Sequence, residues 1–328
     1  MGKILLGSRQ WIFAVTILFQ IYWQPMGKLA VCCFRTRNAI LLFCAMAALA
    51  TSEPSTRQRP ANNSEHGEAS PVGETMWVKA NGLRLKTDIH RSARLSSHPV
   101  LVVVLHGDLL GVRSIPSTTY HYVFAQHATA KMDDLVVVAV LRPGYRDASG
   151  EHSEGEQGLT TGDNYTPEVV DAVAQAIDQL KAKIHPSHTV LAGHSGGAAI
   201  TGDLLGRWPS AVDAAFMVSC PCDLAAWRKH IMRLENNNPI WSASVKSLSP
   251  IELADKVLPS VRVRLLVGSK DPVAPVEISQ RYADVLRRHG DDVMVTVAPG
   301  LGHDILLEPV TLSALTTLVG TLKTGARR

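Results

Sequence analysis

The sequence predicts an α/β fold, a mostly parallel sheet with helices on both faces. Two observations carry this prediction. Continuous apolar runs rich in β-branched residues recur between residues 99 and 298, and amphipathic helical patterns separate them. Strand alternating with helix is typical of parallel sheets that are covered on both faces. The 328 residues, 46% apolar and 19% charged, are typical of a globular protein.

The strands are predicted in order along the chain. A hairpin is expected over residues 76–90, because Asn81-Gly82 is a favoured two-residue turn. Runs typical of buried strands follow, at 99–107, 135–141, 189–193, 214–219, 261–268 and 293–298. We expect the hairpin to form an antiparallel edge of the sheet.

The clearest helical pattern covers residues 166–184. Thr166 suits the N-cap, Pro167 the first turn, and Glu168 the positive end of the helix dipole. The apolar residues of this helix recur at helical spacing: Val169, Val173, Ile177, Leu180 and Ile184. Further helices are predicted at 198–207, 276–290 and 305–323.

Residues 1–50 have the features of a targeting segment. They contain five basic residues and no acidic one. Their second apolar run ends at Ala48-Leu49-Ala50, the small-x-small pattern of a signal cleavage site. We therefore predict a cleaved signal peptide, a mature chain that starts at Thr51, and a secreted or periplasmic protein.

The start of this signal is a separate question, because the tripeptide MGK occurs at Met1 and again at Met26. We hypothesise that Met26 is the initiator, which leaves a signal of ordinary length. A retained leader would instead anchor the protein to a membrane. Its two apolar runs, 11–23 and 39–50, are each shorter than the roughly 20 residues that span a bilayer.

The remaining chain divides into a linker and one domain. Residues 51–74 are rich in Ser, Pro, Asn and Glu, so we predict a disordered linker before a catalytic domain at 75–328. Without residues 1–50 the chain holds 28 basic and 29 acidic residues, so the formal charge of +4 belongs to the leader. With no basic block in the domain, nucleic acid is not an expected partner.

Cys220 and Cys222 are the two cysteines outside the leader. A disulfide between residues two apart would be strained, and two cysteines without suitably spaced histidines make a poor zinc site. We expect two small buried residues, and neither a metal nor an organic cofactor.

Three loops after predicted strands carry residues suited to nucleophilic catalysis. Ser195 lies in Gly193-His194-Ser195-Gly196-Gly197, a G-x-S-x-G sequence between a strand and a helix, as a nucleophile elbow requires. Asp271 follows the strand at 261–268, and His303 follows the last strand. A serine nucleophile needs a base, and the base needs an orienting acid, so these three residues form a candidate triad.

These motifs resemble those of the α/β-hydrolase superfamily. LHGD, RPGY, GHSGG, GSKDPVAP and GLGHD lie in register with the strand pattern over residues 76–323. Within that superfamily the chain looks most like small esterases and the catalytic domains of prolyl-oligopeptidase-type and iminopeptidase-type serine peptidases. The resemblance implies the α/β-hydrolase fold, with Ser195 as nucleophile, His303 as general base and then acid, and Asp271 as orienter.

The tetrahedral oxyanion of such a reaction needs two backbone N–H donors. Gly196 is expected to supply one, and Asp108 or Leu109 the other. A carboxylate close to a developing oxyanion would repel it. The Asp108 side chain must therefore point away or be paired, unless Leu109 is the donor.

The surroundings of the candidate triad are also predicted. His106, Gly107 and His194 should pack near the site, and Tyr145 should form a pocket wall. The segment GDNYT, residues 162–166, is interpreted as a solvated loop with a helix cap, and contact with the site is the alternative.

A small helical cap is a candidate structure for residues 222–258. The apolar residues that would form its underside are Trp227, Met232, Leu234 and Trp241. The alternative is that these side chains pack on the sheet, because apolar residues at helical spacing usually belong to the core.

The predicted activity is that of a serine hydrolase that cleaves a carboxylic ester through an acyl-enzyme. The alternatives are a secreted serine peptidase, aminopeptidase-like or prolyl-oligopeptidase-like, and an acyltransferase. A binding protein on the same fold is disfavoured, because a triad in the expected order is more than a fold needs. The expected partner is a small-molecule ester or a short peptide.

Overall fold

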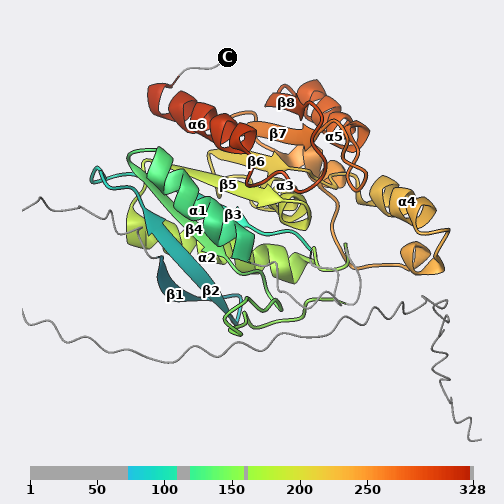
Figure 1. The fold of residues 1–328 in the computed structure, drawn as a ribbon, viewed down its shortest axis with the longest axis horizontal. Coiled ribbons are helices and arrows are strands. Elements are labelled where there is room, and N and C mark those ends of the chain that lie inside the picture. Colours follow the sequence, from blue (N-terminus) through green and yellow to red (C-terminus); the bar gives the residue numbers. More distant parts are fainter. Residues whose placement is uncertain (1–72, 109–118, 159–161, 326–328) are drawn as a thin grey trace, which may run out of the picture. The chain divides into compact units, whose positions relative to one another are not determined.

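The computed structural model describes residues 73–108, 119–158 and 162–325. Within these residues an eight-stranded sheet has the order β1-β2-β4-β3-β5-β6-β7-β8 (Figure 1). The strands are β1 Glu74–Ala80, β2 Leu83–Arg91, β3 Val100–Leu105, β4 Leu135–Val140, β5 His188–His194, β6 Ala214–Val218, β7 Arg262–Gly268 and β8 Asp292–Ala298. The helices are α1 Tyr120–Lys131, α2 Pro167–Ile184, α3 Gly196–Arg207, α4 Leu224–Leu234, α5 Val276–Arg288 and α6 Pro309–Thr324, with short 3-10 helices η2 Pro239–Ser242 and η3 Pro250–Lys256.

The predicted α/β fold is confirmed. Strand β2 is antiparallel to both β1 and β4, and the other neighbouring strands are parallel. The hairpin turns at Asn81 and Gly82, whose φ angles of 48° and 78° are both left-handed, as this turn requires. Because β3 to β8 run parallel, the loops that follow them meet at one edge of the sheet.

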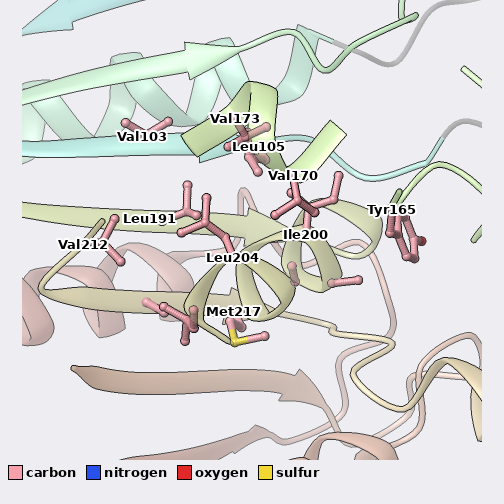
Figure 2. Packing of buried hydrophobic residues seen from close by; sticks show 14 of the residues in the cluster. Val103, Leu105, Tyr165, Val170, Val173, Leu191, Ile200, Leu204, Val212 and Met217 are labelled. Carbon is pink, nitrogen blue, oxygen red and sulfur yellow. The ribbon is translucent and has the colours of Figure 1, made fainter. Parts of the chain in front are cut away.

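Alternate residues of β3 belong to two different core layers. Leu101, Val103 and Leu105 lie in the cluster that contains side chains of α2, α3 and α5. Figure 2 shows Val103 and Leu105 of this cluster together with residues of α2 and α3. Val100, Val102 and Val104 lie in the cluster that contains side chains of α1 and α6. The two-residue period of a strand therefore explains why one apolar run supplies both faces of the sheet.

Helix α2 begins as predicted, with the Thr166 side chain accepting a hydrogen bond from the Val169 N–H. Helix α1 is absent from the sequence prediction. Its buried face mixes polar and apolar side chains, among them His121 and Thr129, so no apolar stripe marks it.

The segment between β6 and β7 packs onto the domain. Trp227 and Trp241 are buried in the core cluster of α2 and α3, and the Trp227 indole N–H donates to the Val273 carbonyl at 2.9 Å. The expected apolar underside is wrong for Leu234, which is 53% exposed. The candidate cap therefore holds α4, η2 and η3, and shares the core of the sheet.

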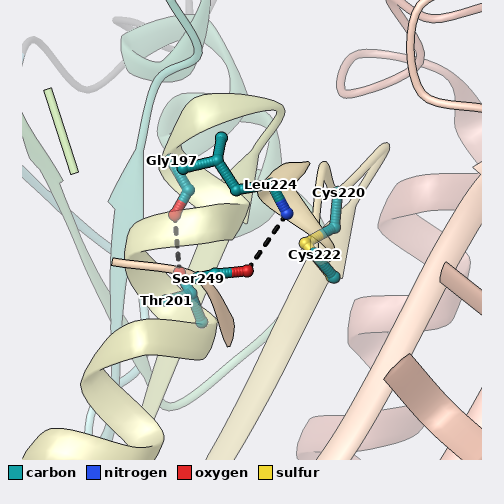
Figure 3. The surroundings of a disulfide bond; sticks show 6 residues. All are labelled: Gly197, Thr201, Cys220, Cys222, Leu224 and Ser249. Atoms are coloured by element: carbon teal, nitrogen blue, oxygen red, sulfur yellow. Dashed lines mark hydrogen bonds between the residues drawn. A yellow bond between two sulfur atoms is a disulfide. The ribbon is translucent and has the colours of Figure 1, made fainter. Parts of the chain in front are cut away.

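The two cysteines correct a prediction. Cys220 and Cys222 are buried, as expected, but they form a disulfide (Figure 3). Their Cα atoms are 5.1 Å apart, within the range that a disulfide spans, so the sequence argument from close spacing was wrong. The bond lies beside the start of α4, where the Ser249 hydroxyl accepts from the Leu224 N–H.

The predicted leader and almost all of the predicted linker lie outside the described residues, as does Leu109. Strand β1 begins at Glu74, one residue before the expected domain boundary. No helix in the described part of the chain is both long and apolar enough to cross a membrane.

Asp203 of α3 provides a test of core electrostatics. Its side chain is fully buried, and neither carboxylate oxygen has a hydrogen-bond partner among the described residues. Burial raises the pKa of Asp203 well above its ordinary value, and Glu252 adds to this rise. The folded state therefore binds a proton on Asp203 more tightly than the unfolded state does. The contribution of this proton to the free energy of unfolding is complete below the ordinary carboxyl pKa of about 3.9 and is lost as pH rises.

We therefore expect Asp203→Asn to have a higher free energy of unfolding than the wild type at pH 8. At pH 4 the difference in free energy between the two proteins should be smaller. Urea unfolding at both pH values measures this difference. The exposed Asp178 of α2 gives a matched control, since Asp178→Asn should follow the wild-type pH dependence. An unchanged pH dependence in Asp203→Asn would contradict the expectation.

Candidate active site

Ser195 lies in the turn between β5 and α3. Its φ and ψ angles are 52° and −119°, a conformation that is costly for a residue with a side chain. The Ser195 N–H donates to the Val218 carbonyl at 2.8 Å, which ties the turn to β6. Strand, strained serine and helix N-terminus follow one another as in a nucleophile elbow.

The glycines around Ser195 are required by close backbone contacts. A Cβ atom on Gly193 would lie 2.3 Å from the Gly197 carbonyl oxygen. One on Gly197 would lie 2.5 Å from the His106 carbonyl oxygen. Atoms of the backbone cannot give way as a flexible side chain does, so both positions exclude larger residues.

The loops after β5, β7 and β8 bring the three predicted triad residues together. The Ser195 Oγ and the His303 Nε2 are 2.9 Å apart. The His303 Nδ1 lies 2.9 Å and 3.0 Å from the two carboxylate oxygens of Asp271. With its Nδ1–H donated to Asp271, His303 presents an Nε2 lone pair to the serine hydroxyl.

Asp271 is held as an acceptor for His303. Its side chain is fully buried, and its Oδ1 also accepts from the N–H groups of Val273 and Ala274 at 2.9 Å and 2.8 Å. Burial alone would raise the pKa of Asp271, but the hydrogen bond and charge of His303, with the two N–H groups, lower it below its ordinary value. The carboxylate therefore stays ionised at neutral pH.

Asp108 lies against the N-terminus of α3, and its carboxylate is paired. Its Oδ1 accepts from the Arg142 guanidinium at 2.8 Å and from the Tyr145 hydroxyl at 3.2 Å. Its Oδ2 accepts from the Tyr165 hydroxyl at 2.6 Å and from the Gly162 N–H at 3.0 Å. The positive guanidinium compensates the charge that would otherwise oppose an oxyanion.

A chain of hydrogen bonds joins the loop after β3 to the loop that carries His303. The Gly107 N–H donates to the Tyr120 hydroxyl, which lies 2.9 Å from the His194 Nδ1. The His194 Nε2 is 3.0 Å from the His303 carbonyl oxygen. Because that carbonyl only accepts, Nε2 carries the proton of His194, and the Tyr120 hydroxyl donates to Nδ1. Each of these hydrogen bonds then has a defined donor and acceptor.

A sequence model of the prolyl oligopeptidase family matches residues 125–316. The chain belongs to the prolyl oligopeptidase family. The match begins within α1, ends within α6 and includes Ser195, Asp271 and His303. No protein of the curated set matches the sequence.

Solved structures agree on the fold. The chain is similar to an acylaminoacyl peptidase of Pyrococcus horikoshii, with a TM-score of 0.60 and 14% identity, over 80% of this chain and 43% of that one. An esterase of Pyrococcus furiosus has a TM-score of 0.55 and 15% identity, over 82% and 96%. Est1E of Butyrivibrio proteoclasticus, solved with ferulic acid, has a TM-score of 0.55 and 15% identity, over 76% and 99%. The chain thus spans less than half of the peptidase and nearly all of each esterase.

The structure also places the other residues that were predicted for the site of this prolyl oligopeptidase family member. Gly196 begins α3, next to Ser195, and Gly107 is buried beside both Ser195 and His194. The His106 Nε2 accepts from the Arg142 N–H, and the Tyr145 hydroxyl donates to Asp108. His106 and Tyr145 are 0% and 2% exposed, so neither forms the surface of an open pocket.

Tyr120 and Arg142 are residues at the site that the sequence prediction does not name. The interpretation of 162–166 as a solvated loop was wrong, and the alternative of contact with the site holds, since Tyr165 is fully buried and bonds to Asp108. The charge of Asp108 could have indicated these contacts from the sequence, because a carboxylate buried near the site needs a cation or hydrogen-bond donors as partners.

One group of side chains in the described part of the chain offers metal-ligand atoms within 4.8 Å of one another: His194, His303 and Asp304. The ring nitrogens of His194 and His303 already take part in the hydrogen bonds described above. A metal ion there would break the Ser195–His303–Asp271 arrangement, so we assign none.

Tyr120→Phe tests the hydrogen-bond chain. It removes the acceptor of the Gly107 N–H and the donor to the His194 Nδ1, and each buried group left without a partner costs about 1–3 kcal/mol. We expect the free energy of unfolding to fall by about 2–6 kcal/mol in urea titrations, because two groups lose their partner. Tyr122→Phe on the same helix is the control, since its hydroxyl makes one long bond of 3.3 Å to Asp147. Equal losses in both variants would count against the chain.

Proposed function

We propose that this protein is a serine hydrolase that cleaves carboxylic esters through an acyl-enzyme. The observation that carries the proposal is the continuous contact from Ser195 Oγ to His303 and from His303 to the Asp271 carboxylate. The strained backbone of Ser195 and the N-terminus of α3 behind it support the same proposal.

In this proposal His303 takes the Ser195 hydroxyl proton as the oxygen attacks the ester carbonyl carbon. The tetrahedral oxyanion is held by the Gly196 N–H, and among the described residues the Asp108 N–H is the candidate second donor. The Gly107 N–H already donates to Tyr120. His303 then gives its proton to the departing alcohol, and water repeats the steps to release the acid and restore Ser195.

Two observations bear on the substrate. The family match and the acylaminoacyl peptidase favour an amide or peptide. The two esterases favour an ester, since their matched part makes up nearly the whole of each enzyme. We place the ester first and keep a peptidase as the second candidate.

Labelling with a fluorophosphonate tests the nucleophile. We expect the wild type to be labelled at Ser195 and Ser195→Ala to lose both label and turnover. Asp271→Asn should keep the fold and lose roughly 10⁴-fold in kcat, the size of effect seen when a triad acid is replaced in serine proteases. Turnover by Ser195→Ala would refute the assignment. A panel of p-nitrophenyl esters and aminoacyl anilides then separates the two substrate classes by kcat/KM.

We also propose that the protein is secreted after cleavage before Thr51. The disulfide of Cys220 and Cys222 supports this, because disulfides persist in oxidising compartments. The secreted form should start at Thr51 in N-terminal sequencing and show two titratable thiols only after reduction. A free-thiol count of two without reductant, or an intact leader in a membrane fraction, would contradict the proposal.

A further inference from the structure

A cavity of about 280 Å³ lies beside the candidate triad. Among the described residues it is lined by Tyr120, His194, Asp304, Leu306 and Leu307. A protein cavity of about 150 Å³ is enough to hold benzene, so this one has room for a small organic group. None of these lining residues belongs to the Ser195–His303–Asp271 arrangement.

The residues that line the cavity are neighbours of Ser195 and of His303. His194 directly precedes Ser195, and the rings of His194 and His303 have centroids 5.2 Å apart. A Cβ atom on Gly107 would lie 2.9 Å from the Ser195 Cβ and 3.1 Å from the Tyr120 hydroxyl oxygen, so Tyr120 flanks the nucleophile across Gly107. Asp304 follows His303 in the chain.

This position determines which part of a substrate the cavity would receive. In the proposed reaction His303 donates its proton to the departing oxygen, so the leaving group must lie against His303. The acyl group remains on Ser195 at that moment. A cavity lined by His194 and Asp304, the neighbours of His303, is therefore placed to receive the alcohol part of the ester.

The charge of the cavity comes from one residue. The Asp304 carboxylate is exposed and lies within 4.8 Å of a ring nitrogen of His194 and of His303. None of the ion pairs among the described residues involves Asp304. Burial, with the nearby His303, lowers the pKa of His194 to about 4, so His194 brings no positive charge at neutral pH. Asp304 gives the cavity a negative charge that takes part in no ion pair among the described residues.

We propose that this cavity selects esters whose alcohol carries a positively charged nitrogen, with Asp304 as the specificity-determining residue. The inference rests on the proposed hydrolase function and adds the substrate class. Tyr120, Leu306 and Leu307 supply the surface for the carbon atoms around the nitrogen.

Two esters of the same shape test the charge alone. Acetylcholine carries a quaternary nitrogen where 3,3-dimethylbutyl acetate carries a neutral carbon. We expect the wild type to prefer acetylcholine by about two- to fivefold in kcat/KM, because an exposed ion pair is weak. Asp304→Asn should bring the ratio close to one, and 0.5 M NaCl should reduce the wild-type ratio by screening. Asp178→Asn, on the exposed face of α2, should keep the wild-type ratio.

The outcomes separate the two proposals. A wild-type ratio of one, or a ratio that survives Asp304→Asn, overturns the inference while hydrolysis of both esters upholds the serine hydrolase. If neither ester is turned over, protection of Ser195 from fluorophosphonate by choline and by 3,3-dimethylbutan-1-ol is compared, with the same preference expected. A serine that no fluorophosphonate labels overturns the proposed function itself.

Discussion

The left-handed backbone of Ser195 is the constraint around which the other parts of the site are arranged. It turns the chain so sharply that β5 and α3 touch, and Gly193 and Gly197 leave no room for a side chain between them. The same turn places the serine oxygen 2.9 Å from His303, at the end of the sheet where the loops after β7 and β8 meet it. A fold that holds such strain needs support from every neighbouring loop.

Asp108 shows how that support is compatible with the proposed chemistry. A Cβ atom on Gly196 would lie 2.3 Å from an Asp108 carboxylate oxygen, so the acid occupies the space that the missing side chain leaves. Arg142, Tyr145 and Tyr165 satisfy that carboxylate from behind. The cluster fixes the loop after β3 against α3 without leaving the Asp108 charge unpaired near Ser195. Removal of Arg142 would leave the buried Asp108 carboxylate without its cation, which is costly.

The sequence predicts those parts of the molecule that local patterns dictate. Strands such as β3 follow from their continuous apolar runs, and Ser195 follows from its glycines and its place after a strand. Helix α1 and the burial of Tyr165 depend on contacts with distant residues, and so leave no periodic signal. The disulfide does not follow from the sequence for a different reason, because spacing along the chain does not determine the distance between two Cα atoms, which is 5.1 Å here.

His194 connects the support of the fold to the chemistry of the site. Its Nδ1 accepts from Tyr120 and its Nε2 donates to the His303 carbonyl, an arrangement open only to the neutral ring. A protonated His194 would also place a positive charge 5.2 Å from the His303 ring, where positive charge develops in the proposed reaction as His303 takes the serine proton. Burial lowers the pKa of His194 to about 4 and so prevents both effects at neutral pH. The residue that precedes the nucleophile thus fixes the loop of the base without competing with it for a proton.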